Sequence, residues 1–166
     1  MSWYFAYGSN MNEARVSARI GDTQRVLAGM LRDYGLRFNK ASKVPGIAHA
    51  NVVSVLGECV EGALFELSHP QQIHDMDPFE GYPHEYDREL LPIHTSEGVI
   101  EAWVYIGTQN RLADTLKPAR EYLEHLLAGR DFLSPDYHAA LARVDVVEGL
   151  DDVTLKQLGL SRHSPR

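Results

Sequence analysis

The sequence predicts a single α+β (mixed α/β) domain, in which about six β-strands alternate irregularly with about four short helices. Its 166 residues suit one domain with a substantial core. A composition of 44% hydrophobic and 23% charged residues is typical of a globular protein. The mixture of strand–strand and strand–helix connections argues against a purely parallel doubly wound sheet. We expect one domain over residues 1–160 and a frayed polar tail over 161–166.

The predicted strands are rich in β-branched and aromatic residues. They are expected over Trp3–Tyr7, Gln24–Asn39, Ile47–Leu56, Cys59–Leu67, Tyr86–His94 and Val99–Ile106. The second is either one long bent strand or two strands with a bulge, because Asp33-Tyr34-Gly35 interrupts its periodicity. Gly57-Glu58 is expected to be a turn between the third and fourth strands. The last two strands are expected to form a hairpin around Ser96-Glu97-Gly98.

The predicted helices are marked by capping residues at their ends. They are expected over Glu13–Ile20, about His69–Pro78, Lys117–Leu127 and Ser134 to about Ala142. Asn12 and Ser68 are candidate N-caps, and Ser134 precedes a proline at the first helical position. Gly129 is expected to stop the third helix.

Charge and cysteine content exclude several classes of function. Lys and Arg number 16 against 23 Asp and Glu, so the net charge of −7 disfavours a nucleic-acid partner. The single cysteine, Cys59, excludes an internal disulfide and is expected to be a small core residue. His69 and His74 lie five positions apart and do not share a helix face, so we expect no metal site. With neither a signal-peptide pattern nor a membrane-length apolar run, a cytoplasmic location without membrane association is expected.

The loop Tyr7-Gly8-Ser9-Asn10 is the first candidate for half of an active site. An aromatic strand ends there in a turn and runs into a helix start, which leaves backbone N–H groups unpaired. Such groups suit a carboxylate or a developing oxyanion. Ser9 itself is a weak candidate nucleophile, because the Gly-x-Ser-x-Gly pattern is missing. We therefore favour the backbone amides over the side chains.

Glu80 is the second candidate. It lies after a predicted helix, between Phe79 and Tyr82, and an apolar wall there would raise its pKa toward neutrality and suit it to proton transfer. The alternative is a solvated surface carboxylate, the commoner state of glutamate. Spacing alone does not decide between them.

Taken together and in order, these segments resemble the γ-glutamylcyclotransferase-like superfamily, which includes γ-glutamyl cyclotransferases, γ-glutamylamine cyclotransferases and plant avirulence-induced proteins. The segments that carry the resemblance, up to about residue 145, are 5–10, 31–38, 46–48, 60–65, 76–81 and 133–137, with Tyr86 and Tyr105. The resemblance implies a small mixed-sheet β-barrel with flanking short helices. It places the loop and the glutamate at one mouth of that barrel.

The resemblance also implies a reaction. The α-amine of a γ-glutamyl compound attacks its own γ-carbonyl and releases 5-oxoproline and an amine or amino acid, with Glu80 as general acid/base. The residues expected to bind the substrate are Tyr7, Gly8, Ser9, Asn10, Met11, Tyr86 and Tyr105. No cofactor or metal is implied. The partner is a small-molecule γ-glutamyl substrate, and the chain is expected to be a monomer or homodimer.

Two other hypotheses for the function stay open at this point. The substrate could be a γ-glutamylamine or a γ-glutamyl-protected metabolite, with specificity set by loops near residues 38–46 and 106–115. Alternatively, the chain could be a non-catalytic domain of the same fold that binds small carboxylates. Such a module would not need the acid/base at Glu80, which argues against it.

Overall fold

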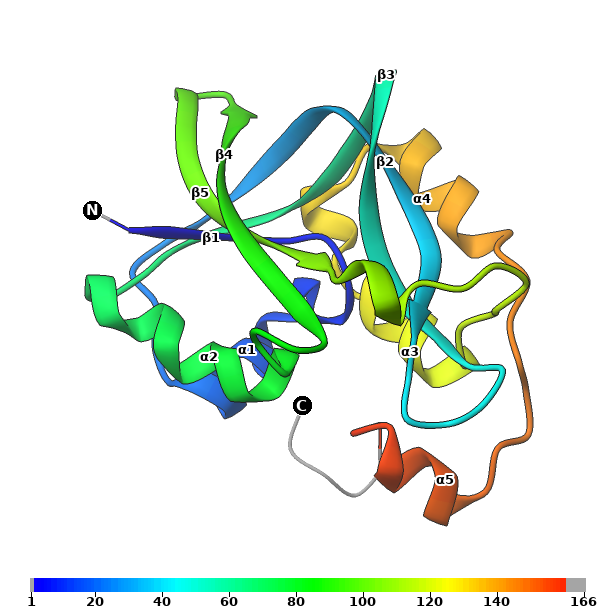
Figure 1. The fold of residues 1–166 in the computed structure, drawn as a ribbon. Coiled ribbons are helices and arrows are strands. Elements are labelled where there is room, and N and C mark those ends of the chain that lie inside the picture. Colours follow the sequence, from blue (N-terminus) through cyan, green and yellow to red (C-terminus); the bar gives the residue numbers. More distant parts are fainter. Residues whose placement is uncertain (1, 161–166) are drawn as a thin grey trace.

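A closed five-stranded barrel forms the centre of the molecule in the computed structural model, which describes residues 2–160 (Figure 1). The strands are β1 (Trp3–Ala6), β2 (Val26–Ala41), β3 (Ala48–Glu66), β4 (Tyr86–Thr95) and β5 (Gly98–Gly107). Their order is β1-β3-β2-β4-β5, and β1 closes the barrel by pairing in parallel with β5. The predicted mixed α+β barrel is confirmed.

The barrel is closed around aromatic and aliphatic side chains. Every residue of β1 is buried, which explains why this strand shows no two-residue alternation. Phe5, Leu64 and Ile93 are inaccessible to solvent and meet at Gly29, where an added Cβ would lie 2.7 Å from Ile93 Cγ2. Each such side chain contributes roughly 1.5–3 kcal/mol through burial. Gly29 is therefore required by the close approach of its neighbours.

The prediction of separate strands over 47–56 and 59–67 is wrong, because both belong to the 19-residue β3. The expected Gly57-Glu58 turn is a bulge within that strand. Gly57 and Asp33 of β2 both have positive φ, and the Gly57 N–H donates to Asp33 Oδ1 at 3.0 Å. The same bulge confirms β2 as one long interrupted strand. Cys59 lies beside it and is exposed, contrary to the expected core position.

Short helices surround the barrel (Figure 1). The α-helices are α1 (Glu13–Ile20), α2 (Ile73–Glu80), α3 (Arg120–Leu127), α4 (Pro135–Ala142) and α5 (Asp152–Gln157). The 3-10 helices are η1 (Ser9–Met11), η2 (Pro70–Gln72), η3 (Gln109–Arg111) and η4 (Arg130–Phe132). The predictions for α1 and α4 are confirmed, including the caps by Asn12 and Ser134. The prediction missed α5, although Asp151 caps it by accepting from the Thr154 N–H.

Three helix boundaries were predicted wrongly. Ser68 does not cap α2, because its hydroxyl donates to the Asp22 carbonyl. The helix also continues through Pro78 and ends at Glu80, before Gly81, which has the left-handed backbone common after helix ends. As a result, Glu80 is the last residue of a helix and not part of a loop. The start of α3 is at Arg120, because Lys117 instead forms a parallel bridge with Ile47.

The predicted tail over 161–166 lies outside the described residues. Within residues 2–160 no helix has the length and apolar character that crossing a membrane requires.

Candidate active site

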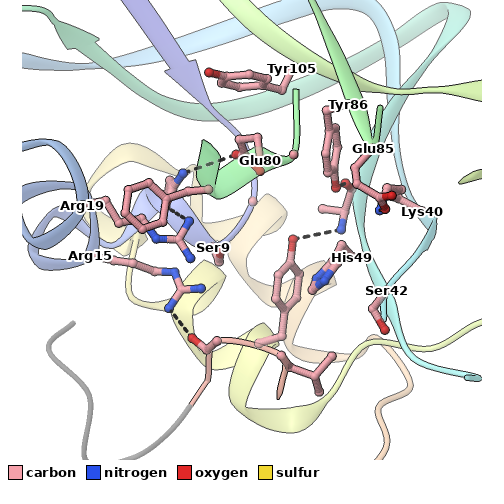
Figure 2. Close-up of a pocket in the computed structure, with 18 of the residues that line it drawn as sticks. Ser9, Arg15, Arg19, Lys40, Ser42, His49, Glu80, Glu85, Tyr86 and Tyr105 are labelled. Carbon is pink, nitrogen blue, oxygen red and sulfur yellow. Dashed lines mark hydrogen bonds and ion pairs between the residues drawn. The ribbon is translucent and has the colours of Figure 1, made fainter. Parts of the chain in front are cut away.

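A pocket of about 350 Å³ lies at one end of the barrel (Figure 2). The topology explains its position. Because β1 and β5 are parallel and the other neighbours antiparallel, the ends of β1, β2 and β5 meet the starts of β3 and β4 there. The loop after β1 and the end of α2 also line this pocket. Two predicted site elements about seventy residues apart are thus brought together.

All but one of the predicted site residues line this pocket. Those that do are Tyr7, Gly8, Ser9, Asn10, Glu80, Tyr86 and Tyr105. Met11 is the exception, because it is fully buried. An added Cβ on Gly129 would lie 2.8 Å from the Cβ of Met11. Met11 therefore belongs to the packing beneath the loop.

The loop turns tightly beneath the pocket. The Met11 N–H donates to the Gly8 carbonyl at 3.0 Å, which closes the first turn of η1. An added Cβ on Gly8 would lie 3.1 Å from the Tyr122 hydroxyl, so the loop packs closely against that ring. Only the third and later N–H groups of such a helix find partners inside it. The earlier N–H groups, including that of Ser9, have no partner inside the helix, and they are the ones that the sequence analysis proposed for binding.

The side chain of Asn10 connects the loop to Glu80. It is 3% exposed, and its Nδ2 donates to the Tyr4 hydroxyl at 2.8 Å and to Glu80 Oε1 at 3.5 Å. Its Oδ1 accepts from an Arg19 Nη at 3.3 Å. The sequence analysis gave weight to backbone amides here. The structure adds a buried side-chain amide that bridges a cation and a carboxylate.

Burial raises the pKa of Glu80 above its ordinary value, and the positive charges of Arg19, Arg15 and Lys40 oppose that rise. The expected source of this burial is only partly right. Phe79 lines the pocket but is 51% exposed, and Tyr82, 36% exposed, does not line it. Buried tyrosine rings also line it: Tyr4, Tyr7, Tyr86, Tyr105 and Tyr122.

All five tyrosine hydroxyls in this wall form hydrogen bonds with other protein groups. Tyr7 donates to the Tyr105 carbonyl at 2.6 Å, and Tyr86 donates to the Ala50 carbonyl at 2.7 Å. The Tyr122 hydroxyl accepts from the Ala50 N–H at 2.9 Å, and that of Tyr4 accepts from Asn10. Because these two hydroxyls act as acceptors in those bonds, their protons can be donated to a ligand.

A partly buried ion pair fixes the helix that carries Glu80. Asp77, three residues earlier in α2, accepts from Arg88 at 2.8 and 3.0 Å and from the Tyr105 hydroxyl at 2.7 Å. Burial acts to raise the pKa of Asp77, but these donors hold it below its ordinary value. Arg88 also lies over the ring of Trp103, 4.4 Å from its centroid. The helix that carries Glu80 is therefore bound through Asp77 to Arg88 of β4 and to Tyr105 of β5.

The sequence analysis missed the basic side chains of the pocket. Arg15 and Arg19 come from α1, and their spacing of four places them on one helix face directly after the loop. That spacing was a usable signal. Lys40, 2% exposed, pairs with Glu85 at 2.9 Å. Burial, followed by the charge of Lys40, lowers the pKa of His49 to about 4, so this side chain is neutral.

Of the two predicted specificity loops, only the first contributes to the pocket. Lys40, Ser42 and Lys43 line it, whereas residues 106–115 supply no lining residue. The lining also includes the segment 157–159, for which the sequence carried no signal. No group of three or more His, Cys, Asp or Glu side chains suited to a metal ion is found in the part of the chain that the structure describes.

Several solved structures have the same fold as this chain. A structure described as a γ-glutamyl cyclotransferase matches with a TM-score of 0.80 at 20% identity, over 94% of this chain and 95% of that one. A human protein described as uncharacterized matches with a TM-score of 0.81 at 21% identity, over the same shares. A yeast γ-glutamyl cyclotransferase described as specific to glutathione matches with a TM-score of 0.62 at 12% identity, over 98% and 97%.

No curated protein is significantly similar to the chain. The family model described as γ-glutamyl cyclotransferase, AIG2-like, matches residues 4–125, which include the loop, Glu80 and every strand of the barrel from Tyr4 onward. This match spans well over half of the sequence. The chain therefore belongs to the γ-glutamyl cyclotransferase, AIG2-like family.

Proposed function

We propose that the protein is a γ-glutamyl cyclotransferase that releases 5-oxoproline from a γ-glutamyl compound, with Glu80 as the general acid/base. One observation carries the proposal. Glu80 is a carboxyl group with a raised pKa that lines the same pocket as the Gly8–Asn10 loop. Family and fold support an activity of this type.

The chemistry is an intramolecular aminolysis. A bond forms between the α-nitrogen and the γ-carbon, and the bond from that carbon to the leaving nitrogen breaks. The α-ammonium group gives up two protons on becoming a ring amide, and the leaving nitrogen gains two on becoming an ammonium ion. A single carboxylate can accept protons from the first nitrogen and return them to the second. A pKa raised toward neutrality suits both directions of transfer.

Binding is assigned to the loop and the ring wall. The amides of Gly8, Ser9 and Asn10 are proposed to hold the γ-glutamyl group, either at its α-carboxylate or at the oxyanion that forms on the γ-carbon. Rings such as those of Tyr86 and Tyr105 restrict the space in which the extended γ-glutamyl chain must fold back. Holding the amine against the carbonyl in this way contributes to the rate through positioning.

A panel of substrates tests the proposal. γ-Glutamyl dipeptides, γ-glutamylamines and glutathione are incubated with the protein, and 5-oxoproline is measured by mass spectrometry. We expect 5-oxoproline from at least one class, together with an equal amount of the free amine. Binding of these compounds without product from any of them would instead support a small-carboxylate-binding domain.

A further inference from the structure

A pair of arginines in the pocket has no carboxylate partner among residues 2–160. Arg15 and Arg19 both line the pocket and lie one turn apart on α1. In the described residues 2–160, neither forms an ion pair with Asp or Glu. Arg15 is only 6% exposed. Its Nη1 donates to the Gly159 carbonyl at 3.0 Å, but its buried Nε has no hydrogen-bond partner in the part of the chain that the structure describes.

This arrangement is unfavourable unless an anion is bound. Burial and the neighbouring charge of Arg19 lower the pKa of Arg15 to about 10. Lys40, the other deeply buried cation of the pocket, is neutralised by Glu85. Buried charges in proteins are normally paired. Among the described residues, Arg15 therefore lacks a carboxylate partner such as Lys40 has.

The unpaired edge of Arg15 has the shape that a carboxylate requires. Because Nη1 is engaged by Gly159, the Nε–H and the second Nη group remain to donate in parallel. That fork is the geometry by which a guanidinium binds both oxygens of a carboxylate. The segment 157–159, which positions the fork, lies outside the residues that match the family model.

The arginines occupy a different part of the pocket from Glu80. The Asn10 side chain lies between Arg19 and Glu80 and is hydrogen-bonded to both. Figure 2 shows Arg15 beside the Gly159 carbonyl, with Glu80 on the side of the pocket toward Tyr105. The α-carboxylate of a γ-glutamyl group is attached to the same carbon as the reacting amine, so it stays near Glu80. A carboxylate at Arg15 is then a second one.

We propose that Arg15 and Arg19 form an anion subsite that binds a carboxylate on the leaving amine. The proposal rests on the function proposed above and makes it specific. The substrates are γ-glutamyl amino acids or peptides, and γ-glutamylamines, which lack this carboxylate, are poor substrates. The subsite sets specificity for the leaving group, and the proton transfers stay assigned to Glu80.

A matched pair of substrates tests the subsite. γ-Glutamyl-alanine and γ-glutamyl-ethylamine differ only by the carboxylate of the leaving group. We expect the wild-type chain to prefer γ-glutamyl-alanine in kcat/KM by about 30-fold or more, the range for a buried charge pair. Arg15→Met should abolish this preference, because its loss in kcat/KM for γ-glutamyl-alanine should exceed its loss for γ-glutamyl-ethylamine by about 30-fold. Arg130→Met, which removes an exposed arginine outside the pocket, is the control that keeps the preference.

Two results would overturn the subsite. One is a wild-type enzyme that uses both compounds equally well. The other is an Arg15→Met variant that loses both activities to the same degree, which would place Arg15 on the α-carboxylate or in the framework. If Arg15→Met fails to fold, as judged by circular dichroism, the ratio of the two kcat/KM values in Arg19→Met carries the same test, because Arg19 is only partly buried.

A binding measurement separates failure of the subsite from failure of the proposed function. If neither compound yields 5-oxoproline, their affinities for the wild-type chain and for the arginine variants are measured by calorimetry. Tighter binding of γ-glutamyl-alanine that depends on Arg15 supports the subsite even without turnover. Equal affinities for the two compounds contradict it.

Discussion

The side-chain amide of Asn10 donates a hydrogen bond to the carboxylate of Glu80 across 3.5 Å, between residues 70 positions apart in the sequence. The same amide group holds Arg19 through its oxygen and Tyr4 through its nitrogen. The loop after β1 and the last residue of α2 are therefore joined by a buried side chain. Asn10 orients the group to which we assign the proton transfers.

Replacing Asn10 tests this orientation. In Asn10→Ala, Glu80 loses a donor that favours its charged form, so its pKa should rise further. We expect kcat/KM to fall by about tenfold or more, and the acid limb of its pH profile to move to higher pH. Asn110→Ala, at an exposed asparagine of η3, should leave both unchanged. A loss of activity with an unshifted profile would count against an effect on Glu80.

Ser9 separates the acid/base mechanism from a serine nucleophile. We expect Ser9→Ala to lower kcat by less than about tenfold, because the backbone amide persists in the variant and the hydroxyl has no assigned step. Steady-state assay of 5-oxoproline release measures this. A total loss equal to that of a Glu80 variant would restore Ser9 as a nucleophile.

The raised pKa of Glu80 predicts how stability depends on pH. As the pH rises, the carboxyl group ionises first in the unfolded chain, at its ordinary pKa, while the folded protein keeps its proton. The unfolded state then binds fewer protons, so the free energy of unfolding falls until the pH passes the raised pKa. Glu80→Gln lacks this dependence. Urea unfolding across this window should show the variant gaining stability relative to wild type as the pH rises; a constant difference would contradict the raised pKa.

Tyr105 is predicted to act through the framework. Its hydroxyl donates to Asp77 at 2.7 Å, beside the Arg88 ion pair. In Tyr105→Phe we expect a loss of about 1–2 kcal/mol in the free energy of unfolding, because a hydrogen bond to a charged group is removed. For a chain of this size, that lowers Tm by roughly 2–8 °C. KM should change little; a large rise in KM without loss of Tm would show that the hydroxyl binds substrate.

The sequence was informative wherever local rules decide the structure. Asn12, Ser134 and their helices were predicted correctly because side-chain caps act within a few residues. The bulge in β3 was read as a turn, because Gly57 favours a turn locally, and only pairing with Asp33 of β2 keeps the strand continuous. The conformational propensities of single residues carry no information about such cross-strand bonds.

The sequence indicated the loop and Glu80 as candidates, but it did not indicate the residues that surround them in the pocket. Local pattern and family resemblance singled out the loop and Glu80, and the structure brings both to one pocket. Of the neighbours expected to bury Glu80, Phe79 lines the pocket but is largely exposed, and Tyr82 lies outside its lining. Barrel closure supplies the actual wall from distant strands, and the segment 157–159 reaches the pocket through a helix that the sequence did not reveal.

Glu80→Gln tests the central claim most directly. The substitution keeps the size of the side chain and removes its ability to exchange a proton. With a substrate identified by the panel, we predict a loss of about 10²–10⁴-fold in kcat for 5-oxoproline release, with substrate affinity and fold retained. Asp75→Asn, at an exposed carboxylate of the same helix, should keep wild-type activity. Release of 5-oxoproline by Glu80→Gln at the wild-type rate would contradict the account.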